Sequence, residues 1–157
     1  MVERRAGFLI SKIHQLSGRL LTQKTRKYDL DISPAQGRII FALWDKEEMS
    51  FQDLLFETQL GKSTLSSMVK TLEKAGYLKR KDHPDDDRKK RIQLVKKAPE
   101  LKKKYQSIAK EIDQIYFEGI SEEDIVQFEK TLDKVLENLI NASGKSLARE
   151  NSRISHD

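Results

Sequence analysis

The chain has 157 residues and a mass of 18.2 kDa, the size of one ordinary domain, and its formal net charge is +5. It contains no cysteine, which excludes disulfides, thiolate chemistry and any peroxide sensing through a thiol. The longest uninterrupted apolar run, from Ile39 to Trp44, is far shorter than the roughly 20 residues of a membrane span. We therefore expect a cytoplasmic protein that does not enter a membrane.

Two helices are predicted in the first third of the chain. Apolar residues between Leu9 and Leu20 recur at steps of four, three and four, which predicts an amphipathic helix over about 5–28. The segment from Ser33 to Gln36 supplies an N-cap serine, a proline in the first turn and a glutamine at the capping-box position. A second helix should therefore begin there and end near Asp45.

Two shorter helices follow, separated by a tight break. Ser50 and Asp53 repeat the capping pattern and predict the start of a third helix, which ends before Leu60–Lys62. Beyond the break, apolar residues from Leu65 to Leu72 occupy one face of a fourth helix, and Gly76 is suited to end it. The second helix of the pair carries small polar and basic side chains, which is the pattern of a helix-turn-helix.

The apolar period changes from helical to alternating after Gly76. Tyr77–Lys81 and Arg91–Val95 are short strand-like segments, and His83–Asp87 between them is dense in turn-forming residues. The pattern predicts a β-hairpin, which directly after a helix-turn-helix is a wing.

Two amphipathic helices are predicted at the end of the chain. Pro99 starts the fifth, and Ser121 with the acidic residues behind it starts the sixth. Both have heptad-like apolar seams, which need a partner surface in the same chain or in a second copy. The sequence is polar from about Asn141 onward, and we expect a frayed end there.

Positive charge is concentrated around the predicted hairpin. Between Tyr77 and Lys104 there are twelve Lys or Arg and five Asp or Glu, a local excess larger than the net charge of the whole chain. Such a block fits a surface for a polyanion, but it also fits a solvated loop and helix face, and charge alone does not decide between them.

The segments Gly76–Arg80, Asp86–Arg88 and Ile92–Leu94 closely resemble the wing signature of the MarR family, the multiple-antibiotic-resistance regulators. Residues 62–73 resemble the recognition helix of that family, and the order of six helices matches to about residue 142. The resemblance implies a mainly α fold with a small β-hairpin wing, in one domain over residues 1–142 followed by a polar tail over 143–157.

The resemblance also implies a function. Helices over 5–28 and 99–142 would form the interface of a homodimer, and residues 33–98 would form a winged helix-turn-helix that binds double-stranded DNA at a pseudo-palindromic operator. Such a protein regulates transcription, most often as a repressor, and is not an enzyme. Many members bind a small aromatic or anionic effector in a cleft between the dimer and DNA-binding regions.

The candidate site residues come from the predicted recognition helix and the wing. Asp86 is expected to support the wing by steadying Arg88, which in the family reaches into a minor groove. The residues expected to contact DNA are Ser63, Thr64, Ser66, Ser67, Lys70, Thr71, Arg80, Arg88 and Lys89.

Three other kinds of site fit parts of the same sequence less well. Asp85–Asp87 could ligate a divalent cation, but the basic residues at 88–91 would repel it, so we expect no metal and no cofactor. No cysteine nucleophile and no glycine-rich phosphate loop is present to indicate an enzyme. His14, Tyr28 and Trp44 could line an effector cleft, although aromatic residues at such places more often pack in a core. The main alternative function is a helical protein-interaction module with a basic hairpin.

Overall fold

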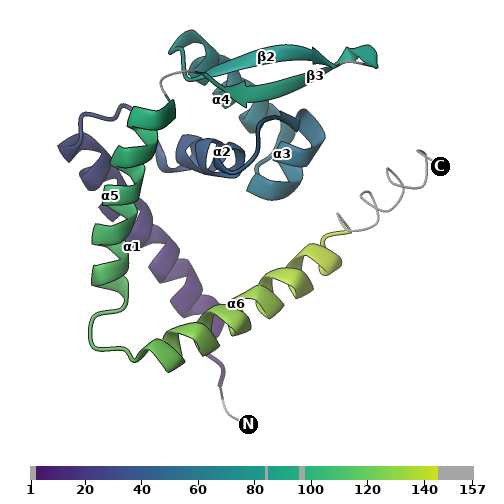
Figure 1. Ribbon diagram of the computed structural model, residues 1–157. Helices are drawn as coiled ribbons and strands as arrows, with labels where there is room; N and C mark the ends of the chain where they lie inside the picture. Colours follow the sequence, from purple (N-terminus) through teal and green to yellow (C-terminus); the bar gives the residue numbers. More distant parts are fainter. Residues whose placement is uncertain (1–2, 84, 96–97, 145–157) are drawn as a thin grey trace. The chain divides into compact units, whose positions relative to one another are not determined.

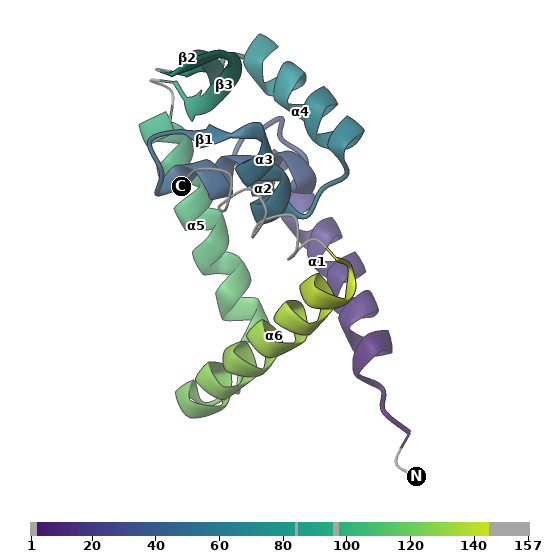
Figure 2. The same ribbon diagram turned by 90° about the vertical axis from the view of Figure 1, so that its right-hand side faces the viewer.

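The computed structural model describes residues 3–83, 85–95 and 98–144, and only the backbone of residues 83, 86–89 and 98. The chain divides into two compact units, residues 1–112 and 113–157. The elements, drawn in Figures 1 and 2, are α1 (Ala6–Lys27), α2 (Pro34–Trp44), β1 (Met49–Ser50), α3 (Phe51–Thr58), α4 (Lys62–Lys74), β2 (Leu78–His83), β3 (Asp86–Leu94), α5 (Ala98–Tyr116) and α6 (Glu122–Ala142).

The described residues form six helices, of which α2, α3 and α6 begin at the serine caps that the sequence predicted. The Ser33 side chain accepts a hydrogen bond from the Gln36 backbone N–H, and the Gln36 side chain accepts one from the Ser33 backbone N–H. Ser50 caps α3 and Ser121 caps α6 in the same way, each accepting a hydrogen bond from the backbone N–H three residues on. The mainly α fold with a β-hairpin wing is confirmed.

The sheet contains one strand more than the hairpin that the sequence predicted. Its strand order is β1-β3-β2, and both pairings are antiparallel. The two-residue strand β1 pairs Met49 with Ile92 and Ser50 with Arg91. Because β1 directly precedes α3, this pairing attaches the first helix of the helix-turn-helix to the central strand of the wing.

The hairpin strands extend further toward the tip than predicted, and their register shifts there. Asp82 is paired with Lys90, whereas the next residue, His83, is paired with Asp86. The backbone of residues 87–89 therefore has no partner position in β2, which makes a bulge. A bulge changes the direction of the side chains in the strand that contains it. This one lies in the segment that includes Arg88, the arginine predicted for the wing.

One apolar core joins α2, α3, α4 and the sheet. The side chains that are at most 2% exposed include Ile39 in α2, Leu54 in α3, Leu65 and Val69 in α4, and Ile92 in β3. Close packing of this kind leaves α4 little freedom to rotate about its axis. The core therefore determines which face of α4 lies outside.

Polar contacts join α1 to α5 within the first unit. Glu111 accepts a hydrogen bond from Lys24 at 2.6 Å and another from the Tyr28 hydroxyl. The Lys24 ammonium, together with the Tyr28 hydroxyl, lowers the pKa of Glu111 from its ordinary value of 4.5 to about 2. The hydrogen bond that the Tyr28 hydroxyl donates to Glu111 raises the pKa of Tyr28.

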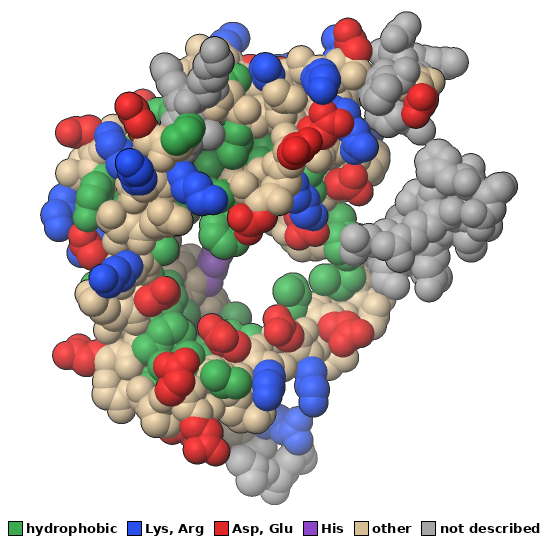
Figure 3. All heavy atoms as spheres, viewed as in Figure 1, with side chains coloured by type: hydrophobic (Ala, Val, Ile, Leu, Met, Phe, Trp, Pro, Cys, Tyr) green, Lys and Arg blue, Asp and Glu red, His purple; other side chains and the backbone are tan. Residues whose placement is uncertain are grey.

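Large apolar side chains are exposed along two of the helices. In α1 they include Phe8, Ile13 and Leu16, each at least half exposed, and in α6 they include Val126, Phe128, Leu132, Leu136 and Leu139. Figure 3 shows hydrophobic side chains lying at the surface among charged ones. Within the described ranges no helix is long and apolar enough to cross a membrane.

Candidate nucleic-acid interface

A three-residue turn connects α3 to α4. Gln59 adopts the left-handed conformation, with φ at 53°, and its backbone N–H donates to the Leu55 carbonyl, which closes α3. Gly61 is the N-cap of α4, and because glycine has no side chain, this helix start lacks a side-chain cap. The backbone N–H groups of the first turn of α4 therefore depend on solvent or a ligand for partners.

The residues of α4 divide between a buried and an exposed face. Leu65, Val69 and Leu72 enter the core. The structure brings six of the predicted DNA-contact residues together on the rest of this one helix: Ser63, Thr64, Ser67, Lys70 and Thr71 are exposed, and Ser66 is partly buried. A rigid helix thus presents hydroxyl groups and an ammonium group side by side, which can donate to and accept from phosphates and base edges.

The end of α4 determines where the wing begins. Gly76 has φ at 80°, and its N–H donates to the Glu73 carbonyl, while the Tyr77 N–H donates to the Leu72 carbonyl at 2.9 Å. These two bonds make a Schellman motif, and Gly76 ends α4 as the sequence predicted. The strand β2 leaves the motif after one residue, so the recognition helix and the wing are rigidly connected.

Arg80, the first candidate in the wing, is held by a residue of α4 that sequence reasoning missed. Its Nε donates to Glu73 Oε1 at 2.8 Å. The two residues are seven positions apart across the Schellman turn, and no pattern in the sequence pairs them.

A second group of charges that the sequence did not reveal braces the base of the wing. Arg91 Nε lies 3.6 Å from Glu48 Oε1, and Lys81 Nζ lies 3.7 Å from Glu48 Oε2. Arg91 Nη1 also lies 3.9 Å from Asp53 Oδ2 in α3. Glu48 immediately precedes β1, so only the unexpected third strand brings it to the wing.

The other wing candidates lie in the bulged segment. Arg88 and Lys89 belong to the residues of β3 that have no partner position in β2, and Asp86 opposes His83 at the tip. The side chains of all three lie outside the described part of the structure. The expected contact between Asp86 and Arg88 therefore stays a prediction.

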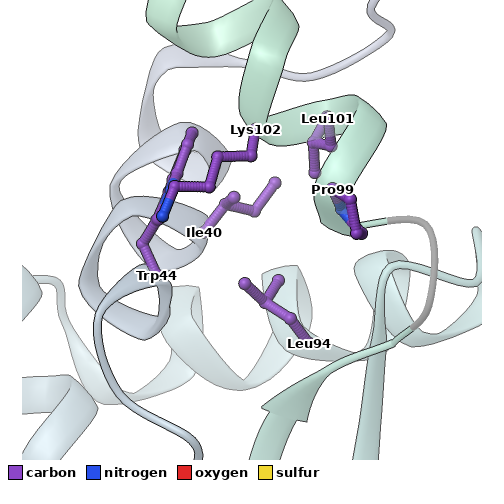
Figure 4. A pocket seen from close by; sticks show the side chains of 6 residues that line it. All are labelled: Ile40, Trp44, Leu94, Pro99, Leu101 and Lys102. Atoms are coloured by element: carbon purple, nitrogen blue, oxygen red, sulfur yellow. The ribbon is translucent and has the colours of Figure 1, made fainter.

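Two pockets in the first unit involve the aromatic residues considered for an effector. His14 and Arg19 of α1 line the first, a pocket of about 530 Å³, together with Arg38 and the first turn of α2. Trp44 lines the second, of about 200 Å³, where Leu94 of β3 and Lys102 of α5 meet α2 (Figure 4). Tyr28 lines neither and instead binds Glu111.

Metal-binding side chains do not gather anywhere in the part of the chain that is described. No group of three or more His, Asp or Glu residues is placed to hold an ion there. The geometry of the site is instead that of a winged helix-turn-helix, the class defined by a tightly turned helix pair followed by an antiparallel hairpin.

Known proteins share this architecture. Residues 32–90 match the family model described as MarR family. The HTH-type transcriptional regulator SarZ of Staphylococcus saprophyticus is 26% identical over 113 residues, which are 71% of this chain and 75% of the relative. A MarR transcriptional regulator from Methanosarcina mazei Go1 has a TM-score of 0.79 and 21% identity, covering 89% of this chain and 99% of its own. The S. aureus MepR-DNA complex has a TM-score of 0.74 and 25% identity, covering 87% of this chain and 99% of its own.

These matches indicate the particular family. The match to the MarR family model covers the winged helix-turn-helix, and the resemblance seen in residues 62–94 is confirmed. SarZ and the Methanosarcina mazei protein are both described as transcriptional regulators.

Proposed function

We propose that the protein is a sequence-specific DNA-binding repressor that acts as a homodimer on a pseudo-palindromic operator. The observation that carries the proposal is the outer face of α4, where five exposed polar side chains stand on a helix fixed by core packing. Residues 33–98 form the DNA-binding region, and α4 enters a major groove while the wing reaches the adjacent minor groove. Repression then needs only occupancy of the operator.

The chemistry of this face suits DNA better than a protein surface. The hydroxyl groups of Ser63, Thr64 and Ser67 can donate or accept, and the N-terminus of α4 carries the partial positive charge of the helix dipole toward a phosphate. The solved MepR relative is itself a complex with DNA. The basic segment from Tyr77 to Lys104 adds the sequence-independent attraction to the backbone.

A second copy of the chain accounts for the exposed apolar side chains. Residues 5–28 and 99–142 form the dimer interface in this proposal, which covers Ile13 and Leu16 of α1 and Leu132 and Leu136 of α6. A two-fold dimer presents two copies of α4 about one helical turn of DNA apart, and the operator therefore has dyad symmetry.

A small organic anion is the effector that the basic pocket fits best. Arg19, Arg38 and His14 line it, together with the N-terminal turn of α2, and none of its described lining residues is acidic. Guanidinium groups bind carboxylates through paired hydrogen bonds. Occupancy of this pocket releases the operator in our proposal.

Selection of bound duplexes from a random library tests the proposal. It should yield a dyad-symmetric sequence, and the affinity for this sequence should fall steeply with salt concentration. Sedimentation should give about twice 18.2 kDa. A monomer with full DNA affinity, or weak binding without sequence preference, would contradict it; the latter is expected of a protein-interaction module with a basic hairpin.

A further inference from the structure

The ion pair between Glu73 and Arg80 joins the recognition helix to the wing across the Schellman turn. Glu73 lies in the last turn of α4, and its side chain is 25% exposed, while that of Arg80 is 36% exposed. The bond of 2.8 Å uses the Nε atom of Arg80. With the described residues, the terminal guanidinium nitrogens of Arg80 make no further hydrogen bond or ion pair.

Strand geometry distinguishes Arg80 from the neighbouring lysines of β2. Side chains two residues apart along a strand share a face, so Arg80 lies on the same face as Leu78, which is 3% exposed in the core. Lys79 and Lys81 lie on the opposite face. Arg80 is therefore the basic residue of this strand that the fold directs toward α4.

Helix geometry places Glu73 in line with two of the DNA-contact candidates. Ser66, Lys70 and Glu73 are spaced by four and three residues, which puts them on one side of α4. The hydrogen bond to Glu73 places the guanidinium of Arg80 beside this side of α4.

A carboxylate on a face that binds DNA repels the phosphates. We therefore expect Glu73 to make a favourable contribution that offsets this repulsion. A charge-assisted hydrogen bond restricts the rotamers of the long arginine side chain before any ligand arrives. A bond through Nε leaves N–H donors on the terminal nitrogens available, and a phosphate oxygen can accept from them.

We propose that Glu73 is a positioning residue for DNA binding, which orients Arg80 so that its terminal nitrogens donate to a phosphate beside α4. The inference rests on the proposed DNA-binding function and deepens it. In this proposal Glu73 favours DNA binding although its negative charge repels DNA. Removing the charge should therefore weaken binding, whereas a general electrostatic effect predicts stronger binding.

The test measures the affinity of the full chain for its selected operator at several salt concentrations. Arg80→Ala should weaken binding about tenfold and lower the logarithmic salt slope by about 1. Glu73→Gln should weaken binding several-fold although it removes a negative charge. Glu73→Asp, which keeps the charge but shortens the side chain, should also weaken it. Lys79→Ala is the matched control for a basic residue on the opposite face of β2, and it should have the smaller effect.

The double variant supplies the decisive readout. In the Arg80→Ala background, Glu73→Gln should strengthen binding, because the carboxylate then only repels phosphates; a merely structural role would weaken binding in both backgrounds. Thermal melting of each variant confirms that it is folded. If Glu73→Gln alone binds the operator as tightly as the unchanged chain, or more tightly, the positioning role is wrong. If the unchanged chain selects no operator, the proposed function fails first, which is a distinct result.

Discussion

Gly37 packs directly against Tyr105, so closely that a Cβ atom at Gly37 would lie 3.0 Å from Tyr105 Oη and 3.5 Å from its Cε1. Tyr105 is 9% exposed, and its ring stands edge-on to Trp44 with the centroids 5.6 Å apart. Its hydroxyl has no hydrogen-bond partner among the described residues, and burial raises its pKa. The contact joins α2 to α5.

The first prediction concerns this contact. Gly37→Ala should lower the free energy of unfolding by about 1 to 2 kcal/mol, because the buried Tyr105 ring has little room to move away. The loss should appear although alanine favours a helix by about 1 kcal/mol over glycine. Urea denaturation measures the change.

Two variants control this measurement. Gly18→Ala, in α1, places its Cβ where no atom lies within 4 Å, and it should gain stability. Tyr105→Phe removes the unpartnered hydroxyl and should restore most of the stability of Gly37→Ala. A Gly37→Ala variant more stable than the unchanged chain would contradict the close contact.

The second prediction concerns the bond between α1 and α5. Because the pKa of Glu111 is lowered to about 2 in the folded chain, its interactions stabilise the fold above its ordinary value of 4.5 and are lost as the pH falls toward 2. Glu111→Gln should therefore melt at a lower temperature than the unchanged chain at neutral pH, and the difference should shrink between pH 4.5 and pH 2.

Glu118→Gln serves as the matched control, since Glu118 is exposed and has no ion pair among the described side chains. Its effect on the melting temperature should be small at every pH. A Glu111→Gln difference that stays constant down to pH 2 would show that the carboxylate charge is not what joins the helices.

Local signals explain how much of the fold the sequence predicted. Ser33, Ser50 and Ser121 each bond to a backbone N–H three residues on, and Gly76 ends α4 through its own φ, so these boundaries depend on neighbouring residues only. The strand β1 was missed because two residues carry no period, and they become a strand only by pairing with β3 some forty residues later.

In the candidate site, too, features set by local spacing were predicted from the sequence, and contacts set by the path of the chain were not. The exposed face of α4 follows from helical spacing once its apolar face is known, and the polar candidates between Ser63 and Thr71 lie on it, Ser66 being partly buried. The pairing of Glu73 with Arg80 depends on the path of the chain through the Schellman turn. The contacts of Glu48 depend on the third strand. Both carboxylates looked like ordinary surface charges in the sequence.

The third prediction concerns the apolar side of α6. Leu136 is 51% exposed, and a second copy of the chain covers it in the proposed dimer. Leu136→Glu should therefore shift the mass in sedimentation toward the monomer and weaken operator binding, because one half-site alone binds poorly. Asn138→Glu adds the same charge at an exposed polar position of the helix and should leave the dimer intact. Equal behaviour of the two variants would remove α6 from the interface.

The last prediction concerns the wing, where the bulge and the family resemblance point to the same residues. The register shift leaves the backbone of residues 87–89 without partner positions in β2, so this segment is not held in the regular ladder. A guanidinium inserted into a narrow minor groove gains from the local negative potential, whereas Lys90, paired with Asp82, remains in the regular ladder. Arg88→Ala should therefore cost about 1 to 3 kcal/mol of operator binding and Lys90→Ala less. Asp86→Ala should also weaken binding, although it removes a negative charge, because the carboxylate orients the arginine.

Anisotropy titrations with the selected operator measure all three variants. Tighter binding by Asp86→Ala, with Arg88→Ala no worse than Lys90→Ala, would mean that the wing acts as a diffuse basic patch and that Arg88 does not read the minor groove.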